Sequence, residues 1–333
     1  MEQVRASDLK SILHSKRANI YYLEHCRLLV NGGRVEYVTD QGKKQLYWNI
    51  PIANTTSILL GTGTSVTQAA MRELAKAGVL VGFCGGGGTP LFSANEVDVD
   101  VAWLSPQSEY RPTEYLQAWV RFWFEDGLRL QAAKRLQAAR LQRLEDAWTA
   151  RALREAGFDV DGERLSALLL KAGPMIEQAR DVTGLLAGEA QLTKALFRLA
   201  ADTVGYGDFV RAKRGTGADA ANRYLDHGNY LAYGLGATAA WVLGLPHGLA
   251  VLHGKTRRGG LVFDAADLVK DAVILPQAFL SAMRGDDEQQ FRRQCIEVLT
   301  RNESLDFIIE TLKLIAMEMS GLANSPVPTE CRP

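Results

Sequence analysis

The side chains best suited to chemistry lie in one short stretch, residues 249–267, which reads LAVLHGKTRRGGLVFDAAD. It holds one imidazole, His253, and two carboxylates three residues apart, Asp264 and Asp267. A glycine-flanked loop between them carries three cations, Lys255, Arg257 and Arg258. Carboxylates with one imidazole can bind a divalent metal ion, and neighbouring cations can hold a phosphate. The stretch therefore indicates a metal ion beside a phosphate.

Each of these residues also has a purely structural interpretation. Asp264 follows a strand-like LVF segment, so it could be the N-cap of a helix with Asp267 in the first turn, where an acid favours the helix dipole. Capping and metal binding are compatible, because residues three apart lie on the same side of a helix. Asp271, one turn later, is either a third contributor or a solvated acid. His253 taken alone is better explained as a hydrogen-bonded core histidine.

Other motifs add little to this chemistry. Glu189 stands near the start of a helix expected from Gly188 to Asp202, where the dipole alone would favour an acid. His247, six residues before His253 and without thiolates nearby, has a poor spacing for zinc and is interpreted as structural. The GTGTSV turn at residues 61–66 lacks the final glycine of dinucleotide-binding turns, and we find no Walker-type loop.

The elements that must position these residues begin with a strand-rich segment, residues 1–103. One helix is expected there, from Ser65 to Ala77, opened by a Ser65-x-x-Gln68 capping box. Alternating apolar residues and turn signals predict the strands Asn19–Tyr22, Cys26–Val30, Arg34–Val38, Leu46–Pro51, Ile58–Leu60 and Val79–Phe83. A turn at Asn31-Gly32-Gly33 is expected to join the second of these strands to the third. Residues 104–113 contain proline and serine and are expected to be an interdomain linker.

Residues 114–321 have helical periodicity almost throughout. A single long helix is expected from Glu114 to about Ala150, with Gly127 as its only weak point. Further helices are expected at Arg164–Leu170, Gly188–Asp202, Asn229–Val242, Asp264–Met283, Asp287–Thr300 and Leu305–Met319. Residues 322–333 carry three prolines and are expected to form a disordered tail. The predicted fold class is α+β, a small β-rich N-terminal domain followed by a larger all-α catalytic domain.

Composition restricts the setting in which the protein works. The 333 residues include 38 basic and 38 acidic side chains, so attraction to a polyanion must come from local patches. The four cysteines form no CxxC pair and the N-terminus lacks a signal-peptide pattern, so we expect a cytoplasmic protein. Residues 228–252 lack charged side chains and could span a membrane, but glycines and a proline interrupt them. Two buried helices, Asn229–Val242 and one from about Gly248, are expected instead, with no membrane contact.

Several motifs, taken in their order along the chain, resemble the CRISPR-associated spacer-integration endonuclease, the catalytic subunit of CRISPR adaptation. GEA at 188–190 with Phe197 looks like the first acidic motif of that family, and NYLAYG at 229–234 looks like its Asn-x-x-Leu-x-Tyr helix. Leu252-His253 followed by FDAAD at 263–267 resembles its histidine and second acidic motif. The ILLGTGTSVT and GVLVGF segments of the β domain fit as well. The resemblance covers roughly residues 10–320.

The resemblance implies metal ligands at Glu189, His253 and Asp267, with Asp264 in or beside the ligand shell. Many members have Glu where this chain has Asp267, so the roles of the two aspartates could be exchanged. Hard oxygen ligands with one imidazole favour Mg²⁺ or Mn²⁺. The resemblance further implies a homodimer, with the β domain in the dimer contact, that joins 3′ ends of short DNA duplexes to the CRISPR repeat by transesterification. It is closest to the subtype whose second adaptation subunit is fused to the helicase-nuclease.

Two basic loops are candidate contacts for double-stranded DNA. One contains Lys255, Arg257 and Arg258, and the other contains Arg211, Lys213 and Arg214. The cations of the long helix suit either a duplex track or a solvated face, and its aromatic residues 119–124 are interpreted as core or dimer contacts. Two other functions stay open: a hydrolytic nuclease acting on branched or damaged DNA, and a non-catalytic DNA-binding scaffold whose acids only cap helices.

Overall fold

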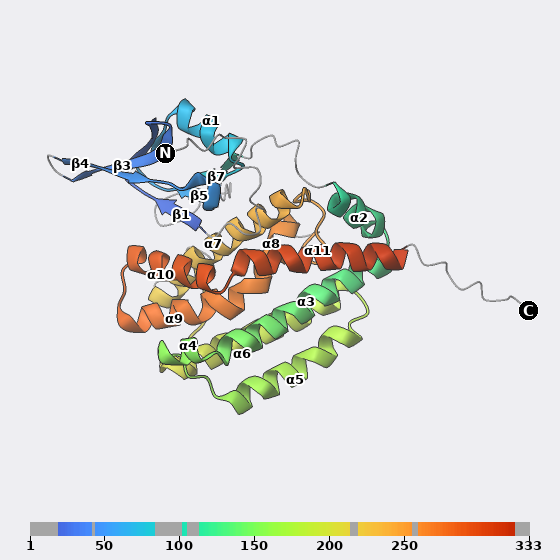
Figure 1. The fold of residues 1–333 in the computed structure, drawn as a ribbon. Coiled ribbons are helices and arrows are strands. Elements are labelled where there is room, and N and C mark those ends of the chain that lie inside the picture. The colour runs from blue at the N-terminus through green and yellow to red at the C-terminus, as the bar shows by residue number, and fades with distance from the viewer. Residues whose placement is uncertain are drawn as a thin grey trace, which may run out of the picture.

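The N-terminal part of the protein is built from strands (Figure 1). The computed structural model describes residues 19–41, 44–83, 102–104, 113–213, 219–254 and 259–323. The strands are β1 (Asn19–Leu23), β2 (Cys26–Asn31), β3 (Arg34–Gln41), β4 (Lys44–Asn49), β5 (Thr55–Leu60), β6 (Ser65–Val66), β7 (Leu80–Phe83) and β8 (Ala102–Leu104). A 3₁₀ turn, η3 (Ile52–Asn54), and one helix, α1 (Gln68–Lys76), lie among them. Two four-stranded sheets result, with strand orders β1-β5-β7-β8 and β4-β3-β2-β6.

Alternating apolar residues explain why these strands form a core of their own. Leu28 on β2, Ile58 on β5 and Val81 on β7 are fully buried and pack with Leu74 of α1. The predicted turn between β2 and β3 is confirmed, because Arg34 pairs with Asn31 across Gly32 and Gly33. Both glycines have positive φ angles, 55° and 79°, which side chains with a Cβ disfavour.

The start of α1 differs from the sequence prediction. Ser65 and Val66 form β6, which pairs in parallel with Arg27 and Leu28 of β2. The helix begins two residues after this strand, and the hydroxyl of Thr67 accepts the N–H of Ala70 as its cap. The predicted capping box at Ser65 is therefore wrong, because Val66, which would have to be the first helical residue, is held extended by its pairing with β2.

The described residues from 114 onward are mostly helical, which confirms the predicted α+β class. Its elements are α2 (Glu114–Trp123), α3 (Asp126–Trp148), α4 (Arg151–Glu155), α5 (Gly162–Gln178), α6 (Val182–Val204), α7 (Ala220–Val242), α8 (Gly260–Val269), a π-helical turn η5 (Lys270–Ile274), α9 (Leu275–Arg284), α10 (Glu288–Arg301) and α11 (Ser304–Ala323). The final helix reaches two residues into the expected tail. In the described residues, no helix is both long and apolar enough to cross a membrane.

Three helices have boundaries that differ from those predicted from the sequence. The expected helix 114–150 is interrupted at Phe124 and Glu125, where the chain turns from α2 into α3. α6 begins at Val182 and is capped by Asp181, so Glu189 lies two turns inside it rather than at its start. α7 begins at Ala220 rather than at Asn229, which places His227 inside a buried helix rather than before its start.

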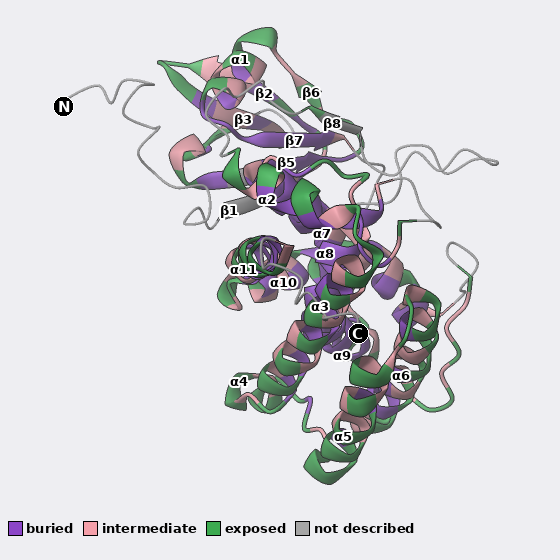
Figure 2. Ribbon diagram, turned by 90° about the vertical axis from the view of Figure 1, so that its right-hand side faces the viewer, coloured by how far each residue is buried: buried purple, intermediate pink, exposed green. Residues whose placement is uncertain are grey.

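α7 and α8 lie in the middle of the molecule, and both are mostly buried (Figure 2). No helix begins near Gly248, contrary to expectation; the described residues after α7 form a loop, and α8 begins at Gly260. α7 passes close to α8 at Gly236, where an added Cβ would lie 2.6 Å from the carbonyl oxygen of Val262. This close approach fixes the position of α8 against α7, and α8 carries the aspartates of the predicted site.

Candidate metal centre

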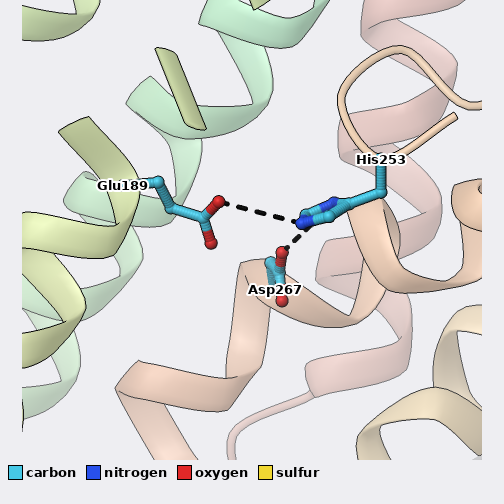
Figure 3. Close-up of side chains that lie close together, drawn as sticks. All are labelled: Glu189, His253 and Asp267. Carbon is cyan, nitrogen blue, oxygen red and sulfur yellow. Dashed lines mark ion pairs between the residues drawn. The ribbon is translucent and has the colours of Figure 1, made fainter. Parts of the chain in front are cut away.

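Three of the predicted site residues come together from three separate elements (Figure 3). Glu189 projects from α6, His253 from the loop before α8, and Asp267 from α8 itself. One ligand atom from each lies within 4.8 Å of the other two. The His253 Nε2 atom is 3.8 Å from Glu189 Oε2, and its Nδ1 atom is 3.8 Å from Asp267 Oδ2. Two carboxylates and one imidazole at these separations fit a single divalent ion.

Asp264 has a different environment from Asp267. It lies inside α8, not at its N-cap, and its side chain is buried. Its Oδ2 atom accepts the backbone N–H groups of Val251 (2.7 Å) and Leu252 (3.1 Å). Its Oδ1 atom accepts the backbone N–H of His253 at 3.0 Å and lies 2.8 Å from the ring Nδ1 of the same residue. These four contacts use about all the acceptor capacity of a carboxylate.

The contact with Asp264 orients the imidazole of His253. When Nδ1 donates to this carboxylate, the neutral form of the ring carries no proton on Nε2, which faces Glu189 and can bind a metal ion. Gly260 supports the same loop, because an added Cβ there would lie 2.8 Å from the Ala250 Cβ and 3.0 Å from the His253 carbonyl oxygen. The loop that carries His253 is therefore packed directly on the first turn of α8.

Two cations that the sequence did not single out hold the acids of the site: Arg140, which is buried, and Lys270, which is partly buried. Lys270, the first residue of η5, forms an ion pair with Asp267, which lies one turn earlier in α8. Arg140, from α3, lies 3.1 Å from Glu189 and donates through Nε to Asp271 at 2.8 Å. Asp271 is thus neither a further ligand nor a solvated acid, as the sequence suggested, but the buried partner of an arginine. The sequence predicts either a duplex track or a solvated face for the cations of the long helix, and the burial of Arg140 excludes both for this residue.

Burial and charge move the pKa values of the site in different directions. The pKa of Glu189 is raised, first because the side chain is buried and then because Asp267 is negative. Burial would also raise the pKa of Asp267, but Lys270 and Arg140 outweigh it and the net shift is downward. Burial would lower the pKa of His253, yet the hydrogen bond to Asp264 and the nearby carboxylates raise it. Glu189 is therefore the acid whose charge is least compensated, and a cation at this position would compensate it.

The cations predicted to contact DNA lie in different environments, and four of them lie outside the described residues. Lys255, Arg257, Arg258 and Arg214 lie outside the described residues. Arg211 is directed inward, pairing with Asp226 and donating to the side chain of Asn222 at 2.7 Å, so it anchors the loop before α7. Lys213 is exposed.

The cations on α2 and α3 do not form an unengaged track along the helices. Each of them donates a hydrogen bond within the protein. The pairs are Arg121 with Ser320, Arg129 with Trp123, Lys134 with Glu177, Arg135 with Glu318, and Arg143 with Asn302. The core interpretation of the neighbouring aromatic residues is confirmed for Trp119 and Phe122, which are fully buried, whereas Phe124 is 72% exposed.

The fold and the cluster of Glu, His and Asp are those expected of an endonuclease of CRISPR systems. The chain matches the family model described as CRISPR associated protein Cas1 over residues 21–311, and it belongs to the Cas1 family. Similar proteins named CRISPR-associated endonuclease Cas1 occur in Pseudomonas aeruginosa (69% identical, 95% of this chain and 98% of the relative) and Pectobacterium atrosepticum (64% identical, 94% and 97%). These matches confirm the resemblance and the enzyme class.

Solved structures of low sequence identity share the fold. The TtCas1–DNA complex has a TM-score of 0.61 at 20% identity and covers 95% of both chains. A casposase bound to its integration product has a TM-score of 0.60 at 14% identity, covering 91% of this chain and 89% of that one. The Cas6-RT-Cas1–Cas2 complex has a TM-score of 0.65 at 12% identity, covering 92% of this chain and 35% of that one.

Proposed function

We propose that this protein is a metal-dependent DNA integrase and endonuclease. It joins the 3′ ends of short DNA duplexes to the CRISPR repeat by transesterification, which is the chemistry of spacer acquisition. The observation that carries the proposal is the convergence of Glu189, His253 and Asp267 from three elements onto one point. Membership of the Cas1 family and the shared fold with a casposase bound to an integration product support it.

Glu189, His253 and Asp267 are proposed as the ligands of Mg²⁺ or Mn²⁺, and Asp264 as the residue that orients His253. A bound ion would lower the pKa of an attacking hydroxyl and stabilise charge on a phosphodiester oxygen. Lys270 favours the ionised form of Asp267, and Arg140 favours the ionised form of Glu189 against the effect of burial. This assigns the two aspartates different work, and the contacts of Asp264 to three backbone amides support the division.

A hydrolytic nuclease acting on branched or damaged DNA is the second candidate, since it would use the same site with water as the nucleophile. The name of the relatives, endonuclease, supports this second candidate. The hypothesis of a non-catalytic scaffold assumes that the acids only cap helices. Asp264 and Asp267 lie inside α8 and Glu189 lies inside α6, so none of the three is a helix cap.

The proposed assembly is a homodimer in contact through the β-rich domain, residues 1–103, joined to the helical domain, residues 114–321, by the linker 104–113. Its partners are double-stranded DNA and the second adaptation subunit, in the form fused to the helicase-nuclease. The shared fold with Cas1 chains in a DNA complex and in a complex with Cas2 supports both partner classes. Lys255, Arg257 and Arg258, with Lys213 and Arg214, are proposed to contact DNA phosphates.

An integration assay separates these functions. The protein is incubated with Mn²⁺, a duplex with free 3′-hydroxyl ends and a plasmid carrying a CRISPR repeat. Integration predicts covalently joined products, whereas hydrolysis predicts cleavage products alone. EDTA and the Asp267→Ala substitution should each abolish both kinds of product. Full activity of a metal-free preparation would refute the metal dependence.

A further inference from the structure

Two indole groups of α2 are directed at the loop that carries His253. Trp119 Nε1 donates to the carbonyl oxygen of Leu249 at 2.9 Å, and Trp123 Nε1 donates to that of Ala250 at 2.8 Å. The two tryptophans are four residues apart, so they project from the same side of the helix and reach consecutive carbonyl groups. Arg129 lies over the ring of Trp123, 5.3 Å from its centre, and holds the end of α2 through the Trp123 carbonyl.

The same loop is held from its other side by Asp264. The indoles use the carbonyl groups of residues 249 and 250, and Asp264 uses the amide groups of residues 251, 252 and 253. Five consecutive residues that belong to neither a helix nor a strand therefore have their backbone fixed by side chains from α2 and α8. His253 is the last of the five, and its ring position depends on where this backbone lies.

We propose that Trp119 and Trp123 are positioning residues for His253. Their indole N–H groups set the path of residues 249–253, so that Nε2 of His253 faces Glu189 and the ring lies beside Asp267. We call these two indole hydrogen bonds the clamp. The expected effect of the clamp on metal binding rests on the proposed function, whereas the clamp itself is present in the metal-free chain. α2 is the first helix described after strand β8, so the clamp also joins the start of the helical part to the site.

The substitution Trp123→Phe removes the N–H group and keeps an aromatic ring, and Trp119→Phe does the same at a fully buried position. Trp148→Phe is the matched control, because Trp148 is also fully buried and its indole donates to a backbone carbonyl, that of Asp271, at 2.9 Å. It removes the same kind of hydrogen bond from the same core without touching residues 249–253. Trp123 is only half-buried, so its variant decides the question if Trp119→Phe does not fold.

Hydrogen exchange of the amides of residues 251–253 is measured in the metal-free proteins, and Mn²⁺ affinity is measured by calorimetry. Loss of one such hydrogen bond predicts about two- to tenfold faster exchange and about two- to tenfold weaker Mn²⁺ binding in Trp123→Phe. The Trp148→Phe protein should match the wild type in exchange, which is the readout that it controls, because its hydrogen bond goes to Asp271 and not to residues 249–253. Unchanged exchange in Trp123→Phe would overturn the clamp, and faster exchange with unchanged Mn²⁺ affinity would overturn its positioning role. A wild-type protein that binds no Mn²⁺ would instead refute the proposed function, while the exchange result would still decide the clamp.

Discussion

Replacing Asp264 with asparagine should lower the free energy of unfolding more than replacing any proposed ligand does. Each carboxylate oxygen accepts two hydrogen bonds, one pair from Val251 and Leu252 and the other from the backbone and ring of His253. An amide retains only one of these oxygens, so one pair of donors would face an NH₂ group. A buried donor without an acceptor costs about 1–3 kcal/mol, and two of them cost about 2–6 kcal/mol.

That loss is large against a total stability of about 5–15 kcal/mol for an ordinary protein. It is measured as the difference in unfolding free energy between metal-free wild type and Asp264→Asn in urea. Asp267→Asn is the matched comparison, because the new amide can still accept from Lys270 and the repulsion of Glu189 is relieved. We expect a smaller loss of stability from Asp267→Asn but no detectable Mn²⁺ binding. Asp264→Asn should keep binding that is weaker by about 10–100-fold, the usual effect of losing a group that orients a ligand.

The reverse pattern would refute the division of roles. If Asp264→Asn were as stable as the wild type and bound no Mn²⁺, while Asp267→Asn still bound the ion, Asp264 would be the ligand and Asp267 the supporting acid. The backbone contacts of Asp264 would then not be what determines its role.

Three further outcomes test the charges around the site and elsewhere. Arg140→Met leaves Glu189 and Asp271 buried without their cation and should lower the unfolding free energy by about 3–5 kcal/mol; adding Asp271→Leu should recover part of the loss in a urea titration, and no recovery would argue against the pair. The pKa of His253 is raised above 6.5, so Mn²⁺ affinity measured by calorimetry should fall as pH drops from about 8 to about 6, because protons compete for its ring nitrogen. The raised pKa of Glu189 adds to this loss at lower pH. A flat profile would contradict the role of His253 as a ligand. Burial and two neighbouring glutamates raise the pKa of Asp306 to about 6, so its ionised form destabilises the fold above that pH. Asp306→Asn should therefore raise the Tm at about pH 8 and not at about pH 4, and an equal shift at both would refute the charge effect.

The sequence located the three clustered side chains through the order of separated motifs rather than through local physics. Taken alone, Glu189 looked like a first-turn acid and His253 like a core histidine, because the contacts that distinguish them come from other elements. Where a signal is local, as at the Gly32-Gly33 turn, prediction and structure agree.

Long-range contacts account for what the sequence could not predict. Arg140 and Asp271 are 131 residues apart, so no spacing rule could pair them. Continuous helical propensity hid the break at Phe124, and no local pattern shows that the Trp123 indole bonds to the carbonyl of Ala250. Asp264 fitted the pattern of an N-cap equally well, because the backbone amides that it accepts belong to a loop whose path depends on tertiary packing.

The most direct test of the proposed metal centre is the anomalous diffraction of a crystal soaked in Mn²⁺. The account predicts one peak within about 2.0–2.4 Å of a carboxylate oxygen of Glu189, the Nε2 atom of His253 and a carboxylate oxygen of Asp267, with Asp264 still bonded to the backbone of residues 251–253. A peak held by Asp264 in place of Asp267, or Mn²⁺ bound elsewhere while these three side chains separate, would contradict it.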